Sequence, residues 1–433
     1  MHAIRQGAAG SVIVFAIMGW RAASADIDAS LAAEINLGFG DTRGQNVQQT
    51  IELIPSIAAD LGPNREAVVS LRLRLDPANT IEAGEAPTAN FGSGSQPAVL
   101  GELGTLEVRD AYIEQRWQRG LVRLGKQQIV WGRLDGLKVL DVVNPMDFRE
   151  FVLDDFADSR LSLWSLYADM TTGPWRTELA LIPDASGHTI PAADSWFNLA
   201  APRFRFGAAP GSQAPNAVTS RRSGAGAGLR LSRRVKSLDI AALAYTGLDH
   251  EPLGRLSVRG NIPMLEQYYE RREVYGISIE GAAGPLAYRA EVSVQPDRIF
   301  NVAGAGTLAA ESLDQVVAGI GFDVDGPWNT FINVQHLQDR VRQAPSDLVR
   351  PATDRVSTVF VRRQFAYETL GVTARWYYSH ELGDQMAALT VNYALSDATR
   401  FTIDINRFRG DRTGLFGQFA DRDRITLRIA HTF

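Results

Sequence analysis

The stretch from Trp131 to Trp164 holds the densest group of side chains that could do chemistry in this chain. Six aspartates, one glutamate and three arginines stand there among leucines, valines and phenylalanines. Charged side chains that face one another across a narrow opening select the solutes that pass it. The candidates for such a constriction are Arg133, Asp135, Asp141, Asp147, Arg149, Glu150, Asp154, Asp155, Asp158 and Arg160.

Enzymatic and metal chemistry find little support in the residue pattern. A GxSxG motif is absent, and no two histidines have the spacing of metal ligands. The glycine-rich residues 223–231 lack the Lys-Ser/Thr ending of a phosphate loop. Asp154, Asp155 and Asp158 could surround Ca²⁺, but we favour pairing with arginine or water. We therefore predict no enzyme, no metal site and no cofactor.

Composition narrows the class of protein. The 433 residues are 45% hydrophobic and 21% charged, as in folded proteins, and the net charge of −5 argues against a nucleic-acid partner. Cysteine is absent, which excludes disulfides and thiolate chemistry. Such a chain can cross an oxidising compartment without mispairing.

The first 25 residues have the pattern of a cleaved secretory signal. Arg5 supplies positive charge, residues 11–20 are apolar, and Ala23-Ser24-Ala25 is a small-x-small cleavage site. A membrane anchor is the alternative, but the run is shorter than the roughly 20 apolar residues that span a bilayer. We predict a signal peptide over 1–25 and one domain over 26–433.

Period-two alternation dominates that domain. In residues 68–76, Val69, Leu71 and Leu73 share one face, whereas Ser70 and Arg72 share the other, which is the pattern of a half-buried strand. Near Asp110 the alternation changes phase, as at a β-bulge. About eighteen strands are predicted, near 30–39, 47–59, 64–75, 104–117, 121–131, 161–170, 174–182, 224–232, 237–246, 270–280, 286–295, 314–324, 327–338, 355–365, 369–379, 384–394, 398–408 and 422–433.

The connections between these strands alternate between short and long. Tight turns at one end and long loops at the other are typical of outer-membrane barrels, which have an even number of antiparallel strands. With one polar and one apolar face, the sheet can pair all its backbone groups in lipid only by closing on itself. We predict an all-β, transmembrane antiparallel β-barrel with an inward-folded loop. A soluble secreted sheet protein, such as a lectin, is the alternative.

Aromatic residues agree with a barrel. Phe433 ends an alternating strand, which resembles the signal read by the barrel-assembly machinery, although His431 departs from the usual apolar residue. Six tryptophans in or beside predicted strands, several of them near strand ends, suit the aromatic girdles at membrane interfaces; they are Trp117, Trp131, Trp164, Trp175, Trp328 and Trp376. For any one of them, packing in the core of a soluble protein is the alternative.

The stretch 131–164 falls in a long outer connection. Asn144 could cap one or two helical turns begun by Pro145, with Phe148, Phe151, Val152 and Phe156 on one side. A loop so apolar and so charged is expected to fold into the lumen and narrow it. Its charges should pair with wall residues Arg72, Arg74, Arg109, Arg123 and Lys126. The alternative is a solvated outer cap.

Four short motifs carry a family resemblance. They are Arg123–Gly132 (RLGKQQIVWG), Asp135-Gly136, Asp141–Pro145 (DVVNP) and Asp158–Trp164 (DSRLSLW). Together, over about residues 120–165, they resemble a porin-like family of Gram-negative outer-membrane β-barrels of unknown function (DUF1302-like), which is distantly similar to alginate-export barrels. The resemblance implies an outer-membrane channel, and it suggests an association with large inner-membrane transporters.

The expected function is passive passage of small hydrophilic or charged solutes across the outer membrane. The alternative is a non-conducting binding or export-partner barrel that works with an inner-membrane transporter. Expected partners are outer-membrane lipid and lipopolysaccharide, the barrel-assembly machinery through Phe433, small solutes and a second copy of the chain, but no nucleic acid.

Overall fold

The computed structural model describes residues 26–40, 46–81, 91–92, 94–210, 217–219, 224–259, 262–304 and 307–433. The predicted signal peptide lies outside the described residues. Within them, no helix is both long and apolar enough to cross a membrane.

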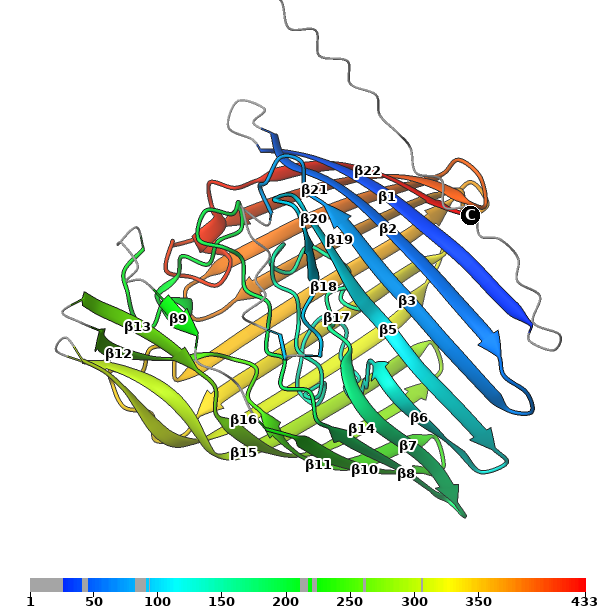
Figure 1. The fold of residues 1–433 in the computed structure, drawn as a ribbon, viewed down its shortest axis with the longest axis horizontal. Helices are drawn as coiled ribbons and strands as arrows, with labels where there is room; N and C mark the ends of the chain where they lie inside the picture. The colour runs from blue at the N-terminus through cyan, green and yellow to red at the C-terminus, as the bar shows by residue number, and fades with distance from the viewer. Residues whose placement is uncertain are drawn as a thin grey trace, which may run out of the picture.

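The described chain forms a closed barrel of 18 antiparallel strands, as the alternation predicts (Figure 1). Each strand pairs with the next, and the first pairs with the last, which removes both sheet edges. The strands are β1 (Ile27–Gly40), β2 (Asn46–Asp60), β3 (Arg65–Leu75), β5 (Gly104–Trp117), β6 (Gly120–Gln127), β7 (Leu163–Thr172), β8 (Trp175–Ile182), β10 (Gly226–Val235), β11 (Leu238–Leu248), β14 (Arg271–Ala283), β15 (Leu286–Gly304), β16 (Thr307–Gly326), β17 (Thr330–Val341), β18 (Thr353–Phe365), β19 (Leu370–Ser379), β20 (Asp384–Ala394), β21 (Thr399–Arg409) and β22 (Arg424–Thr432).

Long connections carry additional pairing that the sequence pattern did not reveal. The short strand β4 (Ala98–Leu100) pairs with the start of β5. Strands β9 (Ala217–Thr219), β12 (Leu253–Arg259) and β13 (Ile262–Tyr268) form a separate small sheet. This sheet lies at the end of the barrel that carries the long loops (Figure 1).

Side chains alternate between the two faces of the wall. On β14 and β15, Tyr275, Ile277 and Val292 are exposed outward, whereas Ser278 and Glu291 are buried inside. An apolar exterior and a polar interior are the arrangement that a barrel in lipid requires. Trp117, Trp175, Trp328 and Trp376 are also exposed, but Trp131 is buried, so its predicted place in an aromatic girdle is wrong.

The ladder confirms the predicted irregularity near Asp110. The pairing of β3 with β5 shifts there, because Ser70 pairs with Asp110 but Leu71 pairs with Val108. β15 and β16 run further than predicted, since a second register shift between Gln295 and Arg298 lets pairing resume beyond Pro296. The strand predicted over 121–131 ends at Gln127.

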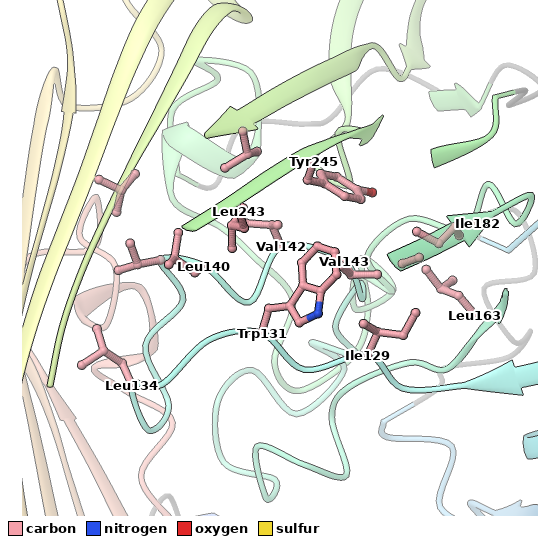
Figure 2. Close-up of a cluster of buried hydrophobic side chains, with 14 residues drawn as sticks. Ile129, Trp131, Leu134, Leu140, Val142, Val143, Leu163, Ile182, Leu243 and Tyr245 are labelled. Atoms are coloured by element: carbon pink, nitrogen blue, oxygen red, sulfur yellow. The ribbon is translucent and has the colours of Figure 1, made fainter. Parts of the chain in front are cut away.

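The chain leaves the wall after Gln127 and returns at Leu163, and its trace runs through the interior of the barrel (Figure 1). We call residues 128–162 the inward segment. Trp131, Leu134 and Leu140 pack with Leu243 and other buried side chains of the wall (Figure 2). The prediction of an inward-folded loop is confirmed by these contacts.

Glycines on the inner face of the wall make room for this packing. A Cβ atom at Gly228 of β10 would collide with Trp131, one at Gly276 of β14 would collide with Leu140, and one at Gly319 of β16 would collide with Leu134. Each of the three side chains of the inward segment therefore occupies space that is open only because the wall residue beside it is a glycine.

No helical turn forms over 144–156, contrary to the prediction. The Asn144 side chain instead accepts a hydrogen bond from the Ile129 N–H (2.8 Å) and donates one to the Leu161 carbonyl (2.6 Å). Extended bridges join Met146 to Arg160 and Asp147 to Thr189. Asn144 thus ties distant parts of the chain together and cannot cap a helix.

Candidate functional site

The first part of the inward segment is fastened to strands β14–β17. The backbone N–H of Arg133 donates to Glu291 Oε1 (2.6 Å). Gln335 accepts from the Asp135 N–H (3.0 Å) and donates to the Asp135 carbonyl (2.7 Å). Asp135 also pairs with Arg289 (2.7 Å). Two of the predicted site residues therefore hold the segment on the wall.

Asp147 is the centre of a buried charge cluster on the opposite wall. Its carboxylate lies 3.7 Å from Arg72, 3.8 Å from Arg74 and 2.5 Å from Arg149. Burial raises the pKa of Asp147 to about 6, although Arg74 and Arg72 oppose this rise. The predicted pairing of the segment with Arg72 and Arg74 is thus present, as a packed ion network with little exposure.

Glu150 and Asp154 lie next along the segment. Glu150 pairs with Arg424 of β22 (2.8 Å) and accepts a hydrogen bond from Gln48 of β2 (3.0 Å). Burial, together with the charges of Glu150 and Glu52, raises the pKa of Asp154 to about 7. Asp154 is therefore partly protonated near neutral pH.

The segment also carries an internal ion pair. Arg160 binds Asp141 (2.9 Å) and stacks over Phe156, with its guanidinium carbon 4.9 Å from the ring centre. Lys138 donates to the Asn144 carbonyl (2.9 Å) and lies 3.9 Å from Asp141. Burial lowers the pKa of Lys138 to about 8.

The remaining predicted wall residues behave differently from one another. Arg109 pairs with Asp158, as the prediction requires. Arg123 instead pairs with Glu114 of the neighbouring strand, so its predicted contact with the segment is wrong. Lys126 has no ion pair in the described part of the chain, although it shares a small recess with Asp158 and Arg160.

A cavity of about 800 Å³ lies between the inward segment and strands β17–β19. Of the predicted residues, Asp135, Asp141, Asp154 and Asp155 line it. On β17 the lining runs from Phe331, close to a short turn, to Asp339, close to a long loop, which at the rise of a strand is roughly 26 Å. The open space thus follows the wall through most of the barrel's depth.

Sequence reasoning did not find the cationic side of this cavity. Its arginines are Arg203, Arg272, Arg298, Arg350, Arg362 and Arg375. Four of these arginines stand at inward positions of strands, namely Arg272, Arg298, Arg362 and Arg375. The alternation of the sequence predicts that they point inward, but it does not show which inward residues line an open cavity.

His188 and His250 also line the cavity, with ring centres 5.6 Å apart. His188 Nδ1 accepts the Met146 N–H (2.9 Å), and burial lowers its pKa well below the usual range. Burial also lowers the pKa of His250 to about 3. Both rings are neutral packing elements, and the described residues contain no cluster of three or more His, Cys, Asp or Glu side chains that could hold a metal.

Residues 35–343 match the model of the family described as "Protein of unknown function (DUF1302)". The chain belongs to the DUF1302 family. No curated protein matches the sequence of this family member. The likeness to alginate-export barrels stays a prediction.

Solved structures of outer-membrane porins share the fold of this DUF1302 member. They include Acinetobacter baumannii OccAB3 (8% identity, TM-score 0.53, 94% of this chain and 99% of that chain covered). Pseudomonas aeruginosa OccK8 (OprE) is 12% identical with a TM-score of 0.53, and 94% and 98% of the two chains are covered. P. aeruginosa OccK2 (OpdF), solved in complex with glucuronate, is 9% identical with the same TM-score and coverage. At these identities the likeness is one of fold.

Proposed function

We propose that this protein is an outer-membrane channel that lets small hydrophilic or charged solutes pass without energy input. The route is the space between the inward segment and strands β17–β19. The observation that carries the proposal is the cavity that follows β17 from Phe331 to Asp339 inside a closed wall.

The outer surface supports a place in the membrane. Exposed apolar side chains such as Leu124, Ile277 and Ile429 cover strands far apart around the barrel. Lipid is the solvent that such a surface fits, because in water it would be a continuous apolar patch. The predicted signal peptide and the terminal Phe433 agree with export to the outer membrane.

The inner surface supports selection among solutes. Asp154 and Asp155 of the inward segment face a wall that carries Arg362 and Arg375, and all four side chains line the same cavity. Acids on one side and bases on the other create a transverse field, which favours small charged or dipolar molecules.

Ion current through the purified full-length protein in planar bilayers tests the proposal. We expect steady ohmic current from the wild-type protein and a severalfold larger current when a short Gly-Ser linker replaces residues 135–158. Flux of a small sugar acid into vesicles should follow the same order. Correctly folded barrels that carry no current in either form would contradict the proposal and favour a non-conducting partner of an inner-membrane transporter.

A further inference from the structure

Apolar side chains line a large part of the cavity beside the inward segment. Leu337, Val356, Phe360 and Tyr377 line it from β17–β19. The inward segment contributes further apolar side chains from the other side, namely Phe151, Val152 and Phe156. A passage used only by inorganic ions has no need of these surfaces, whereas small-molecule binding sites combine apolar and aromatic side chains with a few polar groups.

Two arginines stand within this apolar wall on the half nearer the short turns. The guanidinium carbon of Arg362 lies 5.3 Å from the ring centre of Phe331, and that of Arg375 lies 5.6 Å from the ring centre of Phe360. Phe360 pairs directly with Arg375 and Thr373 with Arg362, so the two arginines are diagonal neighbours across β18 and β19. Diagonal residues in a ladder are roughly 7–8 Å apart, close enough to share one anionic group.

Few carboxylates lie close enough to these two arginines to neutralise their positive charge. Arg362 makes no ion pair with any described residue, and the nearest acid to Arg375 is Asp155, at 4.0 Å. The arginines at the long-loop end of the same cavity are paired closely, for example Arg298 with Asp249 (2.6 Å) and Arg350 with Asp339 (2.6 Å). Available positive charge is therefore concentrated at Arg362 and Arg375.

We infer that the cavity binds an amphipathic solute with a rigid apolar body and a single anionic group. The anionic group lies between Arg362 and Arg375, and the body lies along Phe360, Tyr377 and Val356 towards the long-loop end. The cavity volume of about 800 Å³ falls in the range of small-molecule sites. This inference rests on the proposed function, because it names the class of solute that the channel favours.

The opposing acids do not exclude such a solute. Asp155 is largely exposed, with 65% of its side-chain surface accessible, so water screens its charge. Burial raises the pKa of Asp154 to about 7, so this carboxyl is partly neutral at physiological pH.

Calorimetric titration of the full-length protein in lipid nanodiscs tests the inference, with empty nanodiscs as the blank. The probes are 2-naphthoate, which has the charge and the apolar body, glucuronate, which has the charge alone, and 2-naphthylmethanol, which has the body alone. We expect 2-naphthoate to bind at least tenfold more tightly than either of the others. Equal affinities for 2-naphthoate and glucuronate would overturn the inference.

Variants locate the site. Arg362→Gln, alone or with Arg375→Gln, should weaken 2-naphthoate binding about tenfold, the order expected for the loss of a charge-assisted contact. Arg363→Gln is the matched control, since Arg363 is the next residue along β18 and lies outside the cavity lining. The inference would be overturned if folded Arg362→Gln protein bound 2-naphthoate as tightly as the wild-type protein. It would also be overturned if Arg362→Gln and the control Arg363→Gln lost equal affinity for 2-naphthoate.

Bilayer recordings separate this inference from the proposed function. Current that 2-naphthoate interrupts supports both. Current without 2-naphthoate binding keeps the channel and overturns the inference, whereas binding at this site without any current keeps the inference and overturns the channel.

Discussion

Glu150 of the inward segment and Arg424 of the last strand form an ion pair at 2.8 Å, although they are 274 residues apart in the chain. Arg424 stands at the seam where β22 meets β1, since it pairs with Gly40 in the closing ladder. The segment is thus tied to the place where the barrel closes, in addition to its anchors on β14–β17. Segment position and barrel closure should depend on each other.

Glu150→Gln should lower the free energy of unfolding by about 3 kcal/mol, because it leaves the buried Arg424 guanidinium without its carboxylate. The side chains of Arg424 and Glu150 are only 4% and 14% exposed. Urea titration of the protein in lipid vesicles measures this loss. Glu381→Gln is the control, since Glu381 pairs with a half-exposed Arg355 and its loss should cost at most about 1 kcal/mol. Similar losses in the two variants would argue against the tether.

Gly319→Val should displace the Leu134 side chain from its packing position against β16, since even a Cβ atom at residue 319 collides with that side chain. Overpacking of this kind costs about 1–3 kcal/mol, measurable in the same urea titration. Ala318→Val, at the adjacent outward position, adds similar bulk on the lipid side and should have little effect. If Gly319→Val were as stable as the wild-type protein, Leu134 would not pack directly against Gly319.

Asp154→Asn should change how stability depends on pH. The folded-state pKa of Asp154 is raised from 3.8 to about 7 by burial, so the wild-type protein gains stability from the protonated carboxyl below about pH 4 and loses it as pH rises through 7. Asparagine stays neutral throughout. At pH 4 the variant and the wild-type protein should therefore have the same melting temperature. At pH 8 the melting temperature of the variant should be higher than that of the wild-type protein.

Thermal melts at several pH values measure that difference. Asp155→Asn, which changes an exposed neighbouring carboxylate, should show no comparable gain. A constant difference between Asp154→Asn and the wild-type protein from pH 4 to pH 8 would contradict the assignment.

The barrel itself could be predicted from the sequence, because alternation is a local property of each strand. Leu71 and Arg72 fall on opposite faces of β3 as the pattern requires, and even the bulge at Asp110 is visible as a change of phase. The extent of β15 was not predictable in the same way. Its ladder continues past Pro296 only because a register shift absorbs the missing N–H.

The site could be predicted only in part, since it depends on contacts across the barrel. The charges of the inward segment were identifiable, but nothing local shows that Glu150 meets Arg424 or that Asp147 meets Arg72. Asn144 has the pattern of a helix cap, yet its amide bonds to Ile129 and Leu161 instead.

The sequence of β11 contains a further signal for where the inward segment packs. Leu243 and Tyr245 are apolar at inward positions of β11, where other strands carry polar residues. An inward-facing apolar stripe must be covered from inside the barrel, and Trp131 and Leu140 cover it. Strands that are apolar on both faces therefore indicate where an internal loop will pack.

Cysteine labelling tests whether solutes pass between the inward segment and strands β17–β19. The chain has no cysteine, so Tyr377→Cys and Trp376→Cys each introduce a single thiol, the first in the cavity lining and the second on the exposed outer face of β19. A charged, membrane-impermeant methanethiosulfonate reagent, added during bilayer recording, should reduce the current by about half or more at position 377 and leave it unchanged at position 376. An unchanged current after proven labelling of Tyr377→Cys would contradict the account.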